Sequence, residues 1–318
     1  MRILAIFNRD GGTFRTLDMD AFVRRAEEIA ALQGVDLACR IVGGGELIGE
    51  LEGAAADASA DAVLAGGGDG TISAAATICF RTGKPLAVLP AGTMNFVART
   101  LRVPLDLEQA VAALVTGRFY AVDIATANGR PFLHQFSVGL HARLINLRES
   151  IAYSNRWQKM FATLRAIAGA VSRPLRFEVD LTFRTGRKKR FASGVSVSNN
   201  LLGEGHFPHA DLVDGGVLGV YVAKPMNPLR TAAFCLRVIA GRWKDYQGVS
   251  EEEVTEVTLT FPRRKRTSQA VIDGELVPLE PRVHLRIHPR GLHVLAPQEL
   301  AAELVDAAAS GAPAAVAP

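Results

Sequence analysis

A run of glycines between a strand-like and a helix-like segment is the feature that most constrains this 318-residue sequence. Residues 62–71 read AVLAGGGDGT, so a short apolar stretch leads directly into Gly66, Gly67 and Gly68. The alanine-rich stretch that follows favours a helix, and we expect the hydroxyl of Thr71 to cap it. At such a junction the free backbone N–H groups and the helix dipole attract an anion, and residues without a Cβ let it lie against the main chain. The pattern therefore predicts a phosphate site.

Strand-like and helix-like segments alternate through the first third of the chain. We expect strands at residues 2–8, 35–42, 62–65 and 84–90, and helices at 21–34, 46–57, 71–80 and 106–117. The helical segments are apolar at helical spacing or rich in alanine. The alternation predicts a parallel sheet flanked by helices, whose ligands normally lie at the carboxyl ends of the strands.

The pattern changes after residue 117 to short, often alternating segments punctuated by Gly, Asn and Pro, which predict antiparallel strands. These segments are 118–127, 131–139, 175–186, 189–200, 217–224, 256–261, 268–275 and 283–289. Two helical inserts, 154–171 and 228–243, are expected to cover a face of a β-sandwich, in preference to contacting a membrane.

The predicted fold class is therefore α/β plus β in two domains with the active cleft between them. A parallel α/β domain comprises residues 1–122 and is completed by about 290–300. An antiparallel β-sandwich domain comprises residues 123–289, and the alanine- and proline-rich residues 301–318 form a flexible tail.

Charge is concentrated in two short runs. The net charge is only +4, but RKKR at 187–190 and RRKR at 263–266 hold eight of the 36 basic residues. Solvated hairpin ends are the favoured interpretation, and attraction to anionic lipid is the alternative. Nucleic acid is disfavoured as a partner because no aromatic residues interleave with the basic runs.

Cysteines and apolar runs bear on the compartment. Cys39, Cys79 and Cys235 lie far apart without the paired spacing of a disulfide framework or a zinc site, which favours a reducing compartment. The N-terminal apolar run is too short for a signal peptide, and no uncharged stretch approaches the length of a bilayer span. We therefore expect a cytoplasmic protein without a transmembrane segment.

Two well-known phosphate-binding motifs do not fit the glycine run. In a Rossmann fingerprint the third glycine would fall on Thr71 or on Ser73, and no acidic residue follows about twenty positions later. A Walker A loop needs Gly-Lys-Ser/Thr, whereas the Gly83-Lys84 pair runs into Pro85.

The hexapeptide GGDGTI at 67–72, followed one strand later by LPAGTMNFVART at 89–100, resembles the catalytic-domain family of the diacylglycerol kinases. That family includes sphingosine and ceramide kinases and many bacterial lipid kinases, and is distantly similar to NAD kinases. Further segments that resemble the family are Asn8 after the first strand, residues 122–140, residues 210–222 and VIDGE at 271–275. The resemblance covers roughly residues 2 to 297.

The resemblance implies a role for each matching residue. The expected nucleotide-binding residues are Asn8, Gly66, Gly67, Gly68, Asp69, Gly70, Thr71, Thr93 and Asn95. The expected catalytic carboxylates are Asp273, Glu275 and Asp69, and which of them takes the proton of the acceptor hydroxyl stays open. Asp69 either shares Mg²⁺ with the phosphates or acts as the base. Asp211, Asp214 and Gly216 resemble a second metal-binding loop, although DGG is also a common turn.

The Asp-Gly-Glu segment at 273–275 has two interpretations. In a continuous strand, positions 273 and 275 would point to one face, so both carboxylates would reach the same site. A bare Asp-Gly-Glu is otherwise typical of a hairpin turn, and Asn8 could likewise cap a turn.

Several positions depart from the family pattern. Arg9 replaces the usual proline, Ala74 a glutamate and Phe96 a frequent aspartate, while His141 and Arg143 occupy a segment that is usually acidic. An acid there would suit a cationic sphingoid amine, so a neutral or anionic lipid is favoured over sphingosine. The lost acids also leave open a weakened or inactive enzyme.

The sequence thus predicts an ATP- and Mg²⁺-dependent lipid kinase, with diacylglycerol as the first guess for the acceptor. Its partner would be a lipid substrate at a membrane surface, with which the protein associates peripherally, and a homodimer is left open. The alternatives are a kinase of a non-lipid alcohol and a catalytically degenerate module that binds nucleotide or lipid.

Overall fold

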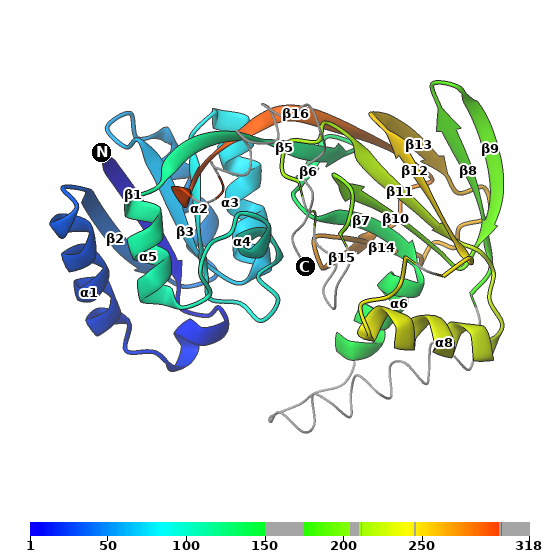
Figure 1. Cartoon of the computed structure of the whole chain (residues 1–318), viewed down its shortest axis with the longest axis horizontal. Coiled ribbons are helices and arrows are strands. Elements are labelled where there is room, and N and C mark those ends of the chain that lie inside the picture. Colours follow the sequence, from blue (N-terminus) through cyan, green and yellow to red (C-terminus); the bar gives the residue numbers. More distant parts are fainter. Residues whose placement is uncertain (150–174, 204–209, 211, 245, 299, 301–318) are drawn as a thin grey trace. The chain divides into compact units, whose positions relative to one another are not determined.

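The computed structural model describes residues 1–149, 175–203, 210, 212–244, 246–298 and 300, which form two compact units (Figure 1). The first unit comprises Met1–Ile124, Asp211–Gly215 and His288–Pro318, and the second comprises Ala125–Ala210 and Gly216–Ile287. The predicted helix at 154–171 and the predicted tail at 301–318 lie outside the described residues.

The first unit is a parallel sheet covered by helices, as predicted. Its strands are β1 (Arg2–Asn8), β2 (Asp36–Val42), β3 (Ala62–Gly67), β4 (Leu86–Pro90) and the last residues of β16 (Arg282–Ala296). Their order is β2-β1-β3-β4-β16, and each neighbouring pair is parallel. The near-continuous burial of β1, β3 and β4 is what a sheet covered on both faces requires.

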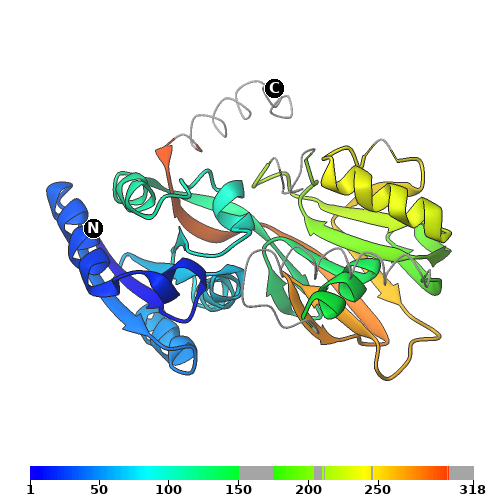
Figure 2. The ribbon, with the colours of Figure 1, turned by 90° about the horizontal axis from the view of Figure 1, so that it is seen from below.

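Helices connect these strands and cover both faces of the sheet. The helices are α1 (Met19–Leu32), α2 (Leu47–Ala56), α3 (Asp69–Thr82), the short α4 (Phe96–Thr100), α5 (Leu107–Val115) and the 3₁₀ turn η1 (Gly12–Thr16). α1 packs beside α5 and α2 beside α3, on opposite faces (Figure 2). Asp18 and Asp106 cap α1 and α5 by accepting from Ala21 N and Gln109 N. The sequence pattern did not indicate η1 or α4.

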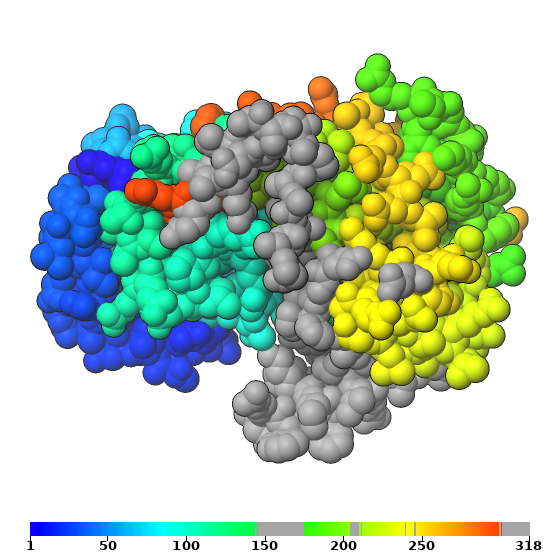
Figure 3. Space-filling model, viewed as in Figure 1, coloured from blue at the N-terminus to red at the C-terminus, as the bar shows by residue number. Residues whose placement is uncertain are grey.

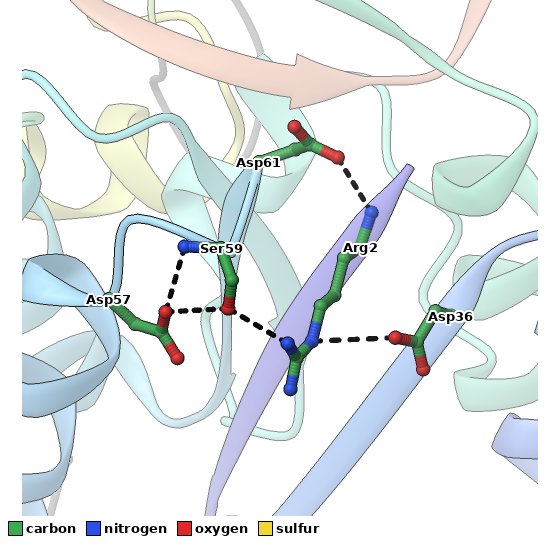
Figure 4. Close-up of polar contacts among 5 residues, drawn as sticks. All are labelled: Arg2, Asp36, Asp57, Ser59 and Asp61. Carbon is green, nitrogen blue, oxygen red and sulfur yellow. Dashed lines mark hydrogen bonds and ion pairs between the residues drawn. The ribbon is translucent and has the colours of Figure 1, made fainter.

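A polar network ties together the amino ends of three strands (Figure 4). The Arg2 backbone N–H donates to Asp61 Oδ2 at 2.7 Å, and its guanidinium contacts Asp36 and the Ser59 hydroxyl. Ser59 in turn donates twice to Asp57, and these bonds, the side-chain bond first, lower the pKa of the Asp57 carboxyl. The network fixes the edge of the sheet opposite to the carboxyl ends of β1, β3 and β4.

The second unit is a sandwich of two antiparallel sheets. One sheet has the order β12-β11-β10-β7-β14-β15, and the other contains β9, β8, β13 and the first part of β16, with β5 and β6 beside it. The strands are β5 (Arg118–Ala127), β6 (Arg130–Phe132), β7 (Gln135–Gly139), β8 (Phe177–Phe183), β9 (Gly186–Ala192), β10 (Gly194–Asn199), β11 (Leu218–Ala223), β12 (Val249–Val254), β13 (Glu256–Thr260), β14 (Gln269–Ile272) and β15 (Glu275–Pro278). One core of buried side chains joins the sheets, with Phe132, Phe136 and Leu181 among its largest members.

Two differences from the predicted strands have local causes. Residues 131–139 divide into β6 and β7, because the backbone N–H groups of Leu133 and His134 donate to a side chain, Asp273, where a continuous strand would pair them with backbone. The sequence also gave no sign of β12, whose residues VSEEEV carry three glutamates. β12 lies at the edge of its sheet, where charged side chains face solvent and discourage further pairing.

Helix α8 (Pro228–Ile239) covers part of this sandwich, as predicted for residues 228–243. Asn227 caps the helix by accepting from Arg230 N, and Pro228 occupies its first turn. Phe234 and Val238 pack on a small buried cluster of Leu202, Tyr221 and Trp243. Another helix in the described part of this unit, α6 (Leu140–Glu149), follows β7 directly. No helix within the described ranges is both long and apolar enough to cross a membrane.

Half of the residues in the two basic runs form ion pairs. On β9, Arg187 contacts Asp180, Lys188 contacts Glu252 at 2.6 Å, and Lys189 contacts Glu178. Arg263 approaches Glu178 as well, at 3.7 Å. Asp180 and Glu178 are buried on β8, so these basic side chains compensate carboxylates that would otherwise be buried without a counter-charge.

We predict that Arg187→Met destabilises the second unit by about 1–3 kcal/mol, because it leaves Asp180 buried without its cation. Arg190→Met is the matched control on the same strand, since Arg190 is exposed. It should change the free energy of unfolding by less than about 0.5 kcal/mol. Urea unfolding of both variants measures the difference, and equal effects would contradict a structural role for Arg187.

Candidate functional site

Three loops meet at the carboxyl ends of β1, β3 and β4 through their glycine backbones. Thr13 N donates to Ala91 O at 2.8 Å, and Gly12 has φ +46°. A Cβ on Gly12 would lie 1.8 Å from Ala91 O, and one on Gly92 would lie 2.9 Å from Gly68 Cα. Because real Cβ atoms do not approach so closely, this contact requires glycine at both positions. Sequence reasoning missed Gly12 and Gly92, and their only signal was a glycine shortly after each strand.

The glycine run divides into a buried half and a half-exposed half. A Cβ on Gly66 would lie 2.5 Å from the ring of Phe7, and one on Gly67 would lie 2.6 Å from Thr71 Oγ1. Gly66, Gly67 and Thr71 are buried. The two glycines and the Thr71 side chain therefore shape the loop from within, which makes any contribution of these groups to a ligand an indirect one.

The half-exposed members are Gly68, Asp69 and Gly70, which form the start of α3. The expected cap at Thr71 is wrong: α3 begins at Asp69, its N-cap is Gly68, and no side chain caps it. The first helical bond runs from Ile72 N to Gly68 O at 3.1 Å. The N–H groups of Asp69, Gly70 and Thr71 precede this bond and have no intrahelical acceptor, so they can bind an anion.

Asn8 links the end of β1 to α3. Its Nδ2 donates to Thr71 Oγ1 at 3.0 Å, while its Oδ1 accepts from Asp10 N at 3.1 Å. The amide thus holds the loop and closes a turn at the same time. The next residue, Arg9, donates its N–H to Val42 O at 3.0 Å and extends the pairing of β1 with β2. The proline usual in the family could not make this bond.

Asp69 holds the loop after β4 in place. Its Oδ1 accepts from Phe96 N at 3.0 Å and its Oδ2 from Asn95 N at 3.2 Å. Asn95 has φ +51°, and its side-chain amide closes on the Gly92 backbone with bonds of 2.8 and 3.0 Å. Thr93, between them, is exposed. The structure therefore brings together all the predicted nucleotide-binding residues, in the first unit.

The Asp-Gly-Glu segment is a hairpin turn between β14 and β15, so the expectation of a continuous strand is wrong. Ile272 pairs with Glu275, while Asp273 and Gly274 have φ +47° and +88°. A two-residue loop with both φ values positive matches the twist of the strands, and Asp-Gly is favoured there.

The Asp273 carboxylate is held by backbone donors. It accepts from Leu133 N, His134 N and Gln135 N at 2.8, 2.9 and 3.0 Å. These bonds occupy most of its acceptor sites and fix its position in the second unit. Glu275 instead points to Arg130, whose Nη2 lies 2.7 Å from its Oε2, and about half of each side chain is exposed.

A cluster of neutral polar side chains lies on β7, β10 and the start of α6. His141 Nδ1 is 2.6 Å from Ser137 Oγ and 3.3 Å from Gln135 Nε2, and Ser196 Oγ donates to Gln135 Oε1 at 2.8 Å. Burial lowers the pKa of His141 to about 4. The imidazole is therefore neutral at pH 7. Sequence reasoning singled out His141 but not Gln135, Ser137 or Ser196, which look like ordinary strand residues.

Asp214 and Gly216 are the residues of the predicted second metal loop that the structure describes. Asp214 Oδ2 lies 3.6 Å from Arg290 Nη2, Gly216 has φ +70° as turns require, and Asp211 is outside the described residues. Among the residues that the structure describes, no three His, Cys, Asp or Glu side chains gather in a group suited to a metal ion. The loop's metal role stays a prediction.

Comparisons with known proteins agree with the sequence resemblance. Residues 2–127 match the family model of the diacylglycerol kinase catalytic domain. An uncharacterized Synechocystis protein is 25% identical over 250 residues, which cover 74% of this chain and 55% of that protein. A Klebsiella pneumoniae protein named "Probable lipid kinase YegS-like" is 31% identical over 126 residues, 38% of this chain and 42% of that protein. The chain thus spans about half or less of the length of these relatives.

A solved structure shares the fold. A Bacillus anthracis protein described as a "putative diacylglycerol kinase" superposes with a TM-score of 0.74 at 21% identity, over 94% of this chain and 96% of that one. The two-part fold predicted from the sequence is therefore confirmed. The resemblance to the diacylglycerol kinase family is confirmed too, and residues 2–127 are the part that matches the model of its catalytic domain.

We predict that Gly92→Ala destabilises the first unit by about 1–3 kcal/mol, because its Cβ would press on the Asn95 side chain and the Gly68 backbone. Gly53→Ala is the control, since a Cβ there meets nothing within 4 Å. In α2 it should be neutral or stabilise by up to about 1 kcal/mol. Urea unfolding measures both effects, and equal behaviour of the two variants would contradict the packing argument.

We also predict a pH effect from His141. The pKa of His141 in the folded protein lies below the ordinary value. Between pH 6.5 and about 4 the imidazole is therefore protonated in the unfolded chain and neutral in the folded one, so the free energy of unfolding falls as the pH falls. His141→Gln removes this contribution. From about pH 7.5 to about pH 5 the wild type should lose on the order of 2 kcal/mol more than the variant.

Urea unfolding at the two pH values tests this prediction. His293→Gln, which removes an exposed imidazole, is the control and should follow the wild type. An equal loss of stability in wild type and His141→Gln would show that His141 is not held neutral.

Proposed function

We propose that this protein is a lipid kinase that transfers the γ-phosphate of ATP to a lipid hydroxyl, with diacylglycerol as the first candidate acceptor. The observation that carries the proposal is the uncapped start of α3, surrounded by glycine loops within the stretch that matches the diacylglycerol kinase catalytic domain. The names of the matching relatives support the acceptor class.

The phosphates of ATP fit the start of α3. The N–H groups of Asp69, Gly70 and Thr71 point out of the helix, and the dipole adds partial positive charge there. Gly68 and Gly70 lack a Cβ, so a phosphate can approach the main chain at these half-exposed positions. A residue with a side chain at Gly68 would extend over this surface.

Asp69 is suited to share a divalent cation with the phosphates. Each of its oxygens accepts one backbone N–H and retains a further lone pair. When bound, Mg²⁺ would neutralise charge between Asp69 and the phosphate oxygens. Such sites use one or two carboxylates, waters and the phosphates themselves, so Asp69 does not need two further acids beside it.

In the transfer step, the acceptor hydroxyl oxygen forms a bond to the γ-phosphorus while the bond to the bridging oxygen of ADP breaks. The hydroxyl proton passes late to a carboxylate, for which Asp69, Asp273 and Glu275 are the candidates. Asp273 is held by three backbone donors and Asp69 by two, whereas Glu275 accepts from the exposed side chain of Arg130. Substitution separates these roles.

The polar cluster in the second unit supports a neutral acceptor. Where the family usually has acids, this chain has His141, which is neutral at pH 7, and Arg143. A neutral imidazole can exchange hydrogen bonds with a hydroxyl or ester but cannot balance the ammonium of a sphingoid base. This chemistry favours diacylglycerol, or another lipid without a cationic head, over sphingosine.

A nucleotide-binding module without transfer is the second candidate. Ala74 replaces an acid in α3, and both Asp69 and Asp273 bind backbone N–H groups. If these bonds are their whole function, the fold retains ATP and does not turn it over.

The test is transfer of label from the γ-phosphate of ATP to extracted bacterial lipids in mixed micelles with Mg²⁺. We expect a labelled lipid, and we expect Asp69→Asn to lower its rate of formation by about 10²- to 10⁴-fold. Asp10→Asn is the matched control, because Asp10 also accepts a backbone N–H, from Gly44 at 2.7 Å, beside the same loops. It should leave the rate within about threefold of the wild type.

Asp273→Asn and Glu275→Gln, each checked by thermal unfolding, then distinguish a base from a structural carboxylate. Binding of ATP with no labelled lipid would overturn the kinase and support the binding module. Label that appears only on a water-soluble alcohol would establish a kinase of a non-lipid acceptor.

A further inference from the structure

The outer face of α8 combines exposed leucines with basic side chains. Leu229 is 80% exposed and Leu236 is 66% exposed. Both lie on α8, whose other side packs on the sandwich. Ala233 and Ala240 are exposed as well. Positions 229, 233, 236 and 240 recur at intervals of four, three and four, so they form one stripe along the helix and the residue after it. The surface of α8 belongs to the yellow area in the lower right of Figure 3.

Basic residues flank this stripe. Arg230 and Arg237 each follow a leucine by one position and are exposed, and the exposed Lys244 continues the charge beyond the helix. From residue 224 to residue 244 the chain has five basic residues and no acidic one. An acidic side chain of a neighbouring element, Glu251 on β12, lies beside the Tyr221 hydroxyl. Tyr221 packs against the inner side of α8, so Glu251 lies on the side of the sheet that the helix covers.

We propose that the outer face of α8 docks on an anionic lipid bilayer, with Leu229 and Leu236 entering the headgroup region and the basic residues contacting lipid phosphates. This inference rests on the proposed function, because it names the surface that would bring the kinase to its lipid.

Charge selects the bilayer over a second copy of the chain. Two copies joined through this stripe would bring their basic residues together, which is unfavourable, whereas an anionic surface attracts all of them. The basic runs at 187–190 and 263–266 are weaker candidates for the same contact. Arg187, Lys188, Lys189 and Arg263 already face carboxylates, so their charge is compensated within the unit.

The stripe also has the dimensions of an interfacial contact. α8 has twelve residues, or about 18 Å of helix, and it is held on the sandwich by Phe234 and Val238. A helix held in this way lies on a surface without having to fold on it, so little ordering entropy opposes the contact.

The test is flotation of the full chain, without ATP, with vesicles of phosphatidylcholine that do or do not contain phosphatidylglycerol. We expect binding only to the anionic vesicles, weakened by salt. Leu229→Ser with Leu236→Ser should reduce the partition coefficient about tenfold or more. Arg230→Gln with Arg237→Gln should do the same, since each basic residue near the surface contributes about fivefold.

Leu32→Ser and Arg24→Gln on α1 are the matched controls, because Leu32 is also 80% exposed and Arg24 is exposed. They should bind vesicles as the wild type does. Wild-type vesicle binding that is absent, or unchanged in the α8 variants, would overturn the proposal. So would a dimer in sedimentation that dissociates in the leucine variant, because a second copy would then occupy the stripe.

Activity separates this proposal from the proposed function. The leucine variant should phosphorylate a short-chain, monomeric diacylglycerol as fast as the wild type and lose activity only on vesicles. If no lipid is phosphorylated in any form but vesicle binding still depends on α8, the docking surface stands and the kinase does not.

Discussion

Contact between the glycine backbones of three loops is the constraint on which the site depends. Gly12, Gly68 and Gly92 lie where the strands β1, β3 and β4 end, and the main chains approach so closely that Cβ atoms on Gly12 and Gly92 would overlap backbone. Side-chain hydrogen bonds then join the loops: Asn8 donates to the Thr71 hydroxyl, and Asp69 accepts from two backbone N–H groups of the loop after β4. The start of α3 is held open as a result, because the polar side chains around it bind other loops and leave its N–H groups uncapped.

The sequence predicted the class of fold because its periodicities are local. Alternating strand-like and helix-like segments indicated the parallel unit, and short punctuated segments indicated the antiparallel one. β12 was missed because its three glutamates belong to an edge strand, a position that depends on which strands are neighbours and not on local pattern. The break between β6 and β7 was missed because its cause, Asp273, lies about 140 residues further along the chain.

The sequence indicated which residues lie at the candidate site more fully than it indicated the structural role of each one. The glycine run and the loop after β4 indicated residues that lie together, but nothing local distinguishes Gly67, where a Cβ would collide with Thr71, from Gly68, where a Cβ would meet only Gly92 Cα, at 3.8 Å. The carboxylates show the same limit. The spacing of Asp69 and Asp273 cannot reveal that each accepts backbone N–H groups from a distant segment. These bonds orient a carboxylate before any ligand arrives, which suits both a catalytic role and a purely structural one.

The number of basic residues in a sequence run is a poor guide to the net charge that the run presents, because ion pairs balance part of it. The densest basic runs are the ones that face buried Glu178 and Asp180, so much of their charge is balanced inside the second unit. The sparser basic residues of α8 have no acidic neighbour along their own segment and stand beside exposed leucines. Binding to a membrane depends on the electrostatic potential of the charges that have no ion-pair partner in the protein. It also depends on the apolar area that the contact buries. On that criterion the isolated arginines of α8 outweigh the clustered ones of β9.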